Sequence, residues 1–312
     1  MIEANNWTKR LKIQQLRAVL AVAAHASLGR AASELGLTQS AITKILREIE
    51  SEIGVALFVR TSRGTHCTEY GEILVAHVRA AFAQIDRAVS EISDAREGLS
   101  GHVRVGTLIA AAAETLPRAV AALSKDRPGL RVTVVEGVYD HLVPQLRRGE
   151  LDLIAGRLPE LGDRQGLRVE LLYREQIAVV ARSGHPAAGL AADLAQLSKW
   201  PWILPPAGTR FRQIVESAFL ERGLPMPQAA LESLSVLSNR CLVLETEHIC
   251  PFPLGVIRHE LDAGSLVRLP IDPPLWFGPV GITYRRDHPL SLAAEAFCAC
   301  LRRAAQFELA GS

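Results

Sequence analysis

The sequence predicts a multidomain protein with an all-α winged helix-turn-helix at the N-terminus, a long helix after it, and a larger α/β domain at the C-terminus. Two observations predict this division. The chain has 312 residues, 48% of them hydrophobic, so at about 100 to 200 residues per domain it can form more than one core. The spacing of its apolar residues is mainly helical up to residue 96 and alternates between strands and helices from residue 101.

The composition argues against several classes of protein. No run of about 18 uncharged apolar residues occurs and residues 1–12 are polar, so we expect no membrane span, no export signal and a cytoplasmic location. The five cysteines lack CxxC spacing, so we expect neither a zinc cluster nor a disulfide framework. An HExxH-like string at 259–263 lacks its second histidine, and neither a GxSxG motif nor a phosphate loop occurs. We therefore expect no catalytic residue, metal or cofactor.

Positive charge is concentrated near the N-terminus, although the net charge of the chain is only +2. Between residues 9 and 63 there are nine basic side chains against four acidic ones. A local excess of this kind indicates a surface that faces phosphate groups.

Three short helices are predicted in this basic region. Residues 14–24 carry apolar side chains at i, i+3, i+4 and i+7, the spacing of one buried helical stripe. Ser27 is a suitable N-cap for a second helix, which Gly36 can end in the left-handed conformation. A third helix is expected over residues 38–53. Two short helices joined by such a turn form a helix-turn-helix, whose second helix enters the major groove of DNA.

The outward face of the third helix carries hydrogen-bond donors and cations. A glutamine there can bond adenine at two points, whereas lysine and arginine suit guanine edges or phosphates. The alternative is an ordinary solvated helix face. The residues expected to contact DNA from this helix are Gln39, Ser40, Thr43, Lys44 and Arg47.

A wing is predicted after the third helix. Residues 55–59 and 65–68 are typical of two short strands, and the arginines between them would contact the DNA backbone or the minor groove. A cation and a hydroxyl beside the helical turn would hold a phosphate. The alternative for each is an ordinary surface group. The contacts expected outside the third helix are Arg30, Thr38, Arg60 and Arg63, with His66 as a further candidate.

A long helix is predicted over residues 70–96. Its apolar residues step by four and three in alternation, which is the a and d seam of a coiled coil. A stripe this narrow has to pair with another helix, and a second copy of the chain is the simplest partner. Residues 97–101 break the helix. The seam consists of Leu74, Val78, Ala81, Ile85, Ala88, Ile92 and Ala95.

Strand and helix patterns alternate between residues 101 and 306, which predicts a parallel sheet covered on both faces. The expected strands lie at 102–108, 132–136, 151–156, 168–172, 176–181, 202–204 and 280–284. The expected helices lie at 115–123, 142–148, 211–222, 234–244 and 292–306.

A small-molecule site is expected in a crevice outside the carboxyl ends of these strands. Free N–H groups at helix starts and the planar cation of Arg210 suit a carboxylate. The alternatives are helix capping for Thr107 and Thr209 and a surface salt bridge for Arg210. The expected contacts are Thr107, Leu108, Ile109, Tyr139, Arg157, Pro206, Gly208, Thr209 and Arg210.

The sequence resembles the LysR-type transcriptional regulators. The segments 31–35, 37–43, 49–50, 57–60 and 68–71 are similar to the family's helix-turn-helix, wing and linker start, and 116–117, 149–153 and 184–186 to its C-terminal domain. Thr43 stands where many members have serine, and residues 245–251 replace a glycine-rich stretch. Residues 245–264 look similar to a branch that controls sugar-uptake and aromatic-acid catabolic genes.

The resemblance implies a sequence-specific regulator of transcription that binds double-stranded promoter DNA, a small-molecule effector and RNA polymerase, as homodimers that assemble into homotetramers. We expect the effector to be a small organic or aromatic acid, with a sugar as the alternative. The implied parts are a DNA-binding domain at 11–68, a dimerisation helix at 69–97 and a periplasmic-binding-protein-like effector domain at 101–306. Its subdomain I would comprise 101–172 and 272–306, and subdomain II 173–271.

Two other classes of protein compete with this interpretation. A small-molecule transport module would not explain the polar face of the third helix. An α/β enzyme would require a nucleophile, metal or cofactor motif, and the sequence has none.

Overall fold

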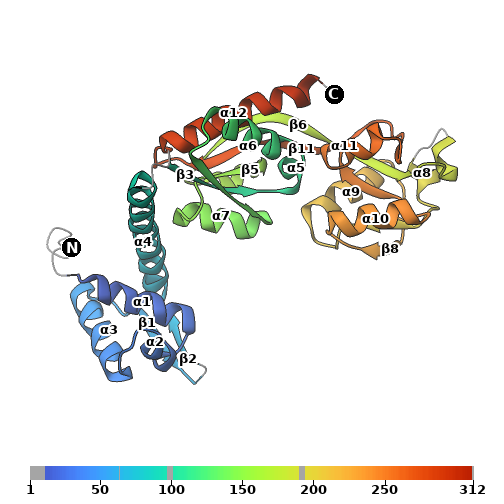
Figure 1. The fold of residues 1–312 in the computed structure, drawn as a ribbon. Coiled ribbons are helices and arrows are strands. Elements are labelled where there is room, and N and C mark those ends of the chain that lie inside the picture. The colour runs from blue at the N-terminus through green and yellow to red at the C-terminus, as the bar shows by residue number, and fades with distance from the viewer. Residues whose placement is uncertain (1–10, 63, 97–100, 190–193, 311–312) are drawn as a thin grey trace. The chain divides into compact units, whose positions relative to one another are not determined.

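The structure is a computed structural model that describes residues 11–62, 64–96, 101–189 and 194–310. The chain divides into two compact units, the first made mainly of residues up to Ser93 and the second mainly of those that follow (Figure 1). None of the helices among the described residues combines the length and the apolar character that a membrane span requires.

The first unit begins with three helices around one core. Ser27 and Thr38 accept hydrogen bonds from backbone N–H groups in the first turns of α2 and α3, so both residues act as N-caps. Gly36 and Gly54 follow these helices with left-handed φ values of 64° and 83°, which confirms the predicted helix ends. The helices are α1 (Ile13–His25), α2 (Leu28–Glu34) and α3 (Gln39–Ile53).

The core of this unit fixes which face of α3 points outward. Ile42, Leu46 and Ile49 are buried against α1 and α2. Ala31 and Ala32 of α2 are also buried, and their small side chains allow the helices to cross closely. The polar side of α3 is therefore exposed, as the sequence predicts.

The wing is a two-stranded antiparallel hairpin of β1 (Phe58–Thr61) and β2 (Gly64–Cys67). The strand predicted over 55–59 is present but begins later, because the Glu50 carboxylate accepts the N–H groups of Leu57 and Phe58 at 2.8 and 3.1 Å. The first strand therefore starts at Phe58 and includes Arg60, which was expected at the tip. At the other strand, the Thr65 N–H donates to the Ala26 carbonyl at 2.9 Å and holds the wing against the α1–α2 turn.

The helix α4 (Glu69–Arg96) follows the wing as one continuous helix. The first part of its predicted seam packs into its own unit, since Val78 is buried and Leu74 contacts the core. Further along, Ile85 and Ile92 are 48% and 69% exposed. The later seam is thus uncovered in a single chain.

The second unit is built on a mixed sheet in the order β10-β6-β11-β5-β3-β4, with β9 also paired to β6. The expected parallel sheet is confirmed in part: within this sheet of the described residues β3 pairs in parallel with β4 and β5, whereas β11, β10 and β9 pair antiparallel with their neighbours. The strands are β3 (Gly101–Thr107), β4 (Leu130–Glu136), β5 (Leu153–Arg157), β6 (Leu167–Arg182), β9 (Cys250–Pro253), β10 (Leu266–Leu269) and β11 (Leu275–Arg285). The separate strands expected at 168–172 and 176–181 are one strand, β6.

Two halves of this unit share the long strands β6 and β11. The first half contains β3, β4 and β5, together with α5 (Ile109–Ala112), α6 (Thr115–Asp126), α7 (Tyr139–Arg148) and α12 (Leu292–Ala310). The second half contains β9, β10, the parallel pair β7 (Trp202–Leu204) and β8 (Ala229–Glu232), and α8 (Leu194–Leu197), α9 (Arg210–Leu220), α10 (Val236–Glu245) and α11 (Leu254–Asp262). Short 3-10 helices lie at Leu161–Arg164 and Pro186–Gly189. Figure 1 shows α12 and α6 side by side over the sheet.

Candidate nucleic-acid interface and small-molecule site

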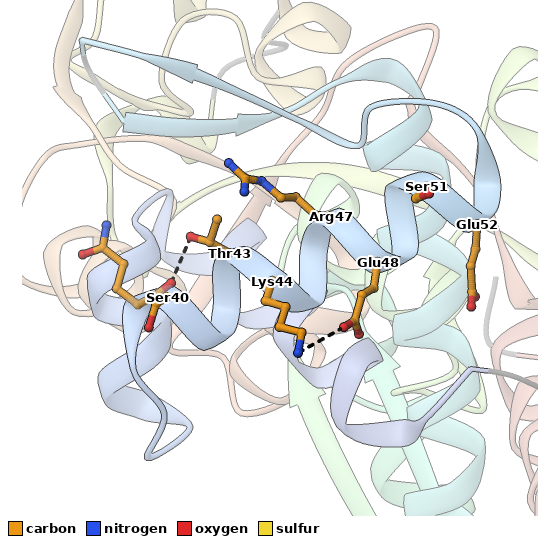
Figure 2. Close-up of a pocket in the computed structure, with 8 residues that line it drawn as sticks. Ser40, Thr43, Lys44, Arg47, Glu48, Ser51 and Glu52 are labelled. Carbon is orange, nitrogen blue, oxygen red and sulfur yellow. Dashed lines mark hydrogen bonds and ion pairs between the residues drawn. The ribbon is translucent and has the colours of Figure 1, made fainter.

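The outward side of α3 forms an open groove of about 890 Å³ (Figure 2). Four of the five residues expected to contact DNA from this helix are exposed, and Thr43 is half-buried. All of the lining residues come from α3, so one rigid element positions them. They are Gln39, Ser40, Thr43, Lys44, Arg47, Glu48, Ser51 and Glu52.

The charge of this groove changes along α3. Lys44 and Arg47 lie within the first nine residues of the helix, Gln39–Arg47, whereas Glu48 and Glu52 follow them. Glu48 lies 4.0 Å from the Lys44 ammonium and accepts a hydrogen bond from the Gln15 amide at 3.3 Å. Carboxylates repel phosphates, so the amino end of α3 is the end suited to a duplex.

Thr43 connects α3 with the wing. Its hydroxyl donates to the Gln39 carbonyl at 2.9 Å and accepts from the Arg60 guanidinium at 3.1 Å. Arg60 therefore lies beside the groove, although it comes from β1. The sequence could not show this contact because the two residues lie 17 positions apart.

The remaining predicted DNA contacts lie around the helical turn. Thr38 Oγ1 shares a hydrogen bond with Ser40 Oγ at 2.9 Å. The Arg30 guanidinium donates to the His25 carbonyl at 2.7 Å and is exposed. His66 is exposed on β2, and Arg63 lies outside the described residues.

In the second unit, two of the predicted small-molecule contacts lie close to Glu160, a residue that was not predicted. Glu160 Oε1 lies 2.9 Å from Arg210 Nη2 and 3.9 Å from Arg157 Nη2. Arg157 ends β5 in the first half, and Arg210 begins α9 in the second half. Burial and the nearby Arg210 lower the pKa of Arg157, while Glu160 and Tyr139 act in the opposite direction. Two cations from different halves therefore lie close to one carboxylate.

The other predicted contacts are held by local structure. The buried Thr107 hydroxyl donates to the Ala155 carbonyl at 3.2 Å. Thr209 caps α9, since its hydroxyl accepts the Arg212 N–H at 3.2 Å. Gly208 has a left-handed φ of 80° in the turn before it. Leu108 and Ile109, at the start of α5, and Pro206, before α9, are half-buried. Arg210 also borders a cavity of about 250 Å³ between α9 and Pro273–Trp276.

A second polar cluster links the two halves. Glu114, before α6, accepts from Arg258 of α11 at 3.0 Å and from Arg118 at 3.1 Å. The buried Glu175 of β6 accepts from the Gly255 N–H at the start of α11 at 3.2 Å. Burial raises the pKa of Glu175 to about 7, against the opposing effects of backbone N–H groups and Arg258. None of these residues was predicted, because their proximity depends on the fold.

Two protein-family models match this chain. A model described as "LysR substrate binding domain" matches residues 96–306, and one described as "Bacterial regulatory helix-turn-helix protein, lysR family" matches residues 13–72. The chain belongs to the LysR family of transcriptional regulators. It is thus a DNA-binding regulator with an effector-binding domain, and the resemblance inferred from sequence motifs is confirmed.

Similar LysR-family proteins cover nearly the whole chain. The regulator GbpR of Azospirillum brasilense is 32% identical over 97% of this chain and 90% of its own length. The regulator PcaQ of Agrobacterium fabrum is 31% identical over 95% and 96%. Both are named as transcriptional regulators, which agrees with the prediction that the chain is not an enzyme.

Solved LysR structures share the fold. An OxyR C206 mutant of Corynebacterium glutamicum has a TM-score of 0.58 at 25% identity and covers 97% of this chain and 94% of its own. Full-length CbnR, in complex with its target DNA, has a TM-score of 0.66 at 20% identity and covers 94% and 100%. These neighbours confirm the predicted fold class.

Proposed function

We propose that this LysR-family regulator reads promoter DNA with the first nine residues of α3, Gln39–Arg47, while the wing and the α2–α3 turn contact the backbone. The observation that supports this is the exposed polar groove, which is cationic at Lys44 and Arg47 and becomes acidic at Glu48. The proposed contacts are Arg30, Thr38, Gln39, Ser40, Thr43, Lys44, Arg47, Arg60 and Arg63.

Fluorescence anisotropy with a duplex from the chain's own upstream region tests this proposal. Affinity is expected to fall steeply as salt rises, because phosphate contacts release counterions. Arg47→Ala is expected to weaken binding about tenfold, whereas the control Ser51→Ala, three positions beyond Glu48 on the same helix, leaves it unchanged. Salt-independent binding, or equal effects of the two variants, would contradict the proposal.

We infer that the effector is a small organic or aromatic acid whose carboxylate binds between Arg157 and Arg210. The support is the convergence of these two cations on the Glu160 carboxylate, from opposite halves of the second unit. An effector carboxylate would take the place of Glu160 and link the halves through its own charge. Such a ligand regulates only if it binds two arrangements of the halves with different affinity. The further proposed contacts are Thr107, Leu108, Ile109, Tyr139, Pro206, Gly208 and Thr209.

Thermal-shift screening with simple aromatic and aliphatic acids, and with sugars, tests the effector class. An acid that stabilises the protein is expected to lose that effect in Arg210→Ala and to keep part of it in Arg210→Lys, which preserves charge but not the planar fork. Stabilisation by sugars alone, or unchanged stabilisation in Arg210→Ala, would favour the sugar alternative.

The same proposal covers the oligomeric state of the regulator, its contact with RNA polymerase and its location in the cell. The uncovered later seam of α4 supports homodimers through that helix, and these are proposed to form homotetramers that contact RNA polymerase in the cytoplasm. The proposed parts are residues 11–68 for DNA, 69–97 for dimerisation and 101–306 for the effector, with subdomain I at 101–172 and 272–306 and subdomain II at 173–271. Sedimentation velocity of the full chain, with and without duplex, measures the assembly.

A further inference from the structure

The Thr43 hydroxyl is already engaged in hydrogen bonds within the protein. Its hydroxyl proton is used by the Gln39 carbonyl at 2.9 Å, and its oxygen already accepts from Arg60 at 3.1 Å. The side chain is half-buried and lines the groove between Ser40 and Arg47 (Figure 2). Its methyl group therefore remains as the part of Thr43 without a hydrogen-bonding role.

The Thr43 methyl is an apolar group among polar and charged side chains. Gln39, Ser40, Lys44 and Arg47 all present hydrogen-bonding or charged ends. A serine at position 43 could make the same two hydrogen bonds, so they do not account for a threonine there. The methyl is the chemical difference, and an apolar group in a polar groove suits an apolar feature of the duplex.

We propose that the Thr43 methyl packs against the 5-methyl group of a thymine in the major groove and so specifies that base. Thymine is the base that presents a methyl group there, and threonine methyls are known to contact it. Arg60 acts as a positioning residue, because its hydrogen bond to the hydroxyl fixes the direction in which the methyl points. The inference rests on the proposed binding of α3 to DNA.

The experiment first selects high-affinity duplexes from a random pool with the full-length protein. Each thymine of the selected sequence is then replaced by deoxyuridine, which pairs identically and lacks only the methyl group. One position per half-site is expected to lose about threefold to fivefold in affinity, the effect of one buried methyl. Thr43→Val loses the hydroxyl but keeps a methyl group, and a valine side chain in a helix strongly prefers one rotamer, so this variant is expected to retain the loss without Arg60. Thr43→Ser is expected to bind both duplexes equally.

A separate measurement tests the positioning role of Arg60. Arg60→Gln is expected to reduce the ratio between the thymine and deoxyuridine affinities, because the Thr43 side chain is no longer held. The control Arg30→Gln removes another exposed cation of the same unit and is expected to weaken both duplexes alike, leaving the ratio unchanged. An unchanged ratio in Arg60→Gln would overturn the positioning role.

The outcomes separate the inference from the function on which it rests. If no sequence is enriched from the pool, the proposed DNA contact fails. If a sequence is enriched but Thr43→Ser keeps the full deoxyuridine effect, or no thymine shows one, the thymine contact is wrong while DNA binding stands.

Discussion

Glu160 and Arg210 form an ion pair of 2.9 Å that joins the two halves of the second unit. Both side chains are more than half exposed, at 57% and 55%, so solvent screens the pair and its contribution to stability is small. A weak link between the halves can be replaced by a ligand of the same charge. If the proposed acidic effector binds here, we expect it to displace the Glu160 carboxylate from Arg210.

Removing that carboxylate should therefore improve the binding of an acid. Glu160→Gln is expected to raise the affinity for a stabilising acid about threefold to tenfold, since the competing charge is lost while both arginines remain. Isothermal titration calorimetry of wild-type and variant measures this. The control Glu216→Gln removes another glutamate that pairs with an arginine of α9, and is expected to leave the affinity unchanged. A weaker acid complex in Glu160→Gln would show that Glu160 supports the ligand instead of competing with it.

Glu175 should make stability depend on pH. Burial raises its folded pKa to about 7 from the ordinary 4.5, so the folded state holds a proton that the unfolded chain releases. Stability is therefore lost as pH rises from about 4.5 to about 7, by at most about 3 kcal/mol, and stays lower above that range. Glu175→Gln is expected to lack this loss. Urea unfolding between pH 5 and 8 measures it, with the exposed Glu221→Gln as control. Parallel pH profiles for Glu175→Gln and wild-type would contradict the expectation.

Gly71, in the first turn of α4, occupies a position where packing leaves no room for a side chain. A Cβ at this position would lie 2.0 Å from the Leu57 carbonyl oxygen, and a backbone atom cannot rotate away. Gly71→Ala is expected to destabilise the first unit by about 2–4 kcal/mol, measured by circular dichroism. Gly29→Ala is the matched control, because Gly29 lies inside α2 with its nearest contact at 4.0 Å. That substitution is expected to raise stability slightly through helix propensity; equal destabilisation by the two would disprove the packing argument.

The exposed later seam of α4 is expected to determine whether the protein forms oligomers. Ile92→Asp is expected to convert the oligomer to monomer, because pairing would bury an unpaired charge. Analytical ultracentrifugation measures this, with Ser93→Asp as the control, since Ser93 is exposed and lies off the seam. A monomeric wild-type protein, or an Ile92→Asp oligomer of unchanged affinity, would exclude pairing through this seam.

The sequence predicted well what is decided by neighbouring residues. The ends of α2 and α3 follow from Ser27, Gly36 and Gly54, whose effects act within a few positions. The outward face of α3 follows from the periodicity of its isoleucines. These elements agree with the structure because nothing distant overrides them.

The predictions failed where a residue distant in the sequence binds the backbone or the charged groups of a segment. The wing begins later than predicted because Glu50 takes the Leu57 and Phe58 N–H groups. The interruption expected between the strands at 168–172 and 176–181 falls at residues 173–175, which the structure places inside β6. Glu175 is instead accommodated by the start of α11, 80 residues away. Similarly, both arginines of the small-molecule site were predicted and Glu160 was not, since only the fold brings it to Arg210.

The ladder between β6 and β11 is interrupted twice, between Trp276 and Gly278 and between Val280 and Gly281. Register shifts of this kind bend the strands where they occur, so the bend in β6 and β11 is expected over this short stretch. Glu175 pairs with Gly278 inside it. The irregular stretch of the ladder thus contains an ionisable side chain, so a change of pH would alter the charge at the place where the sheet bends.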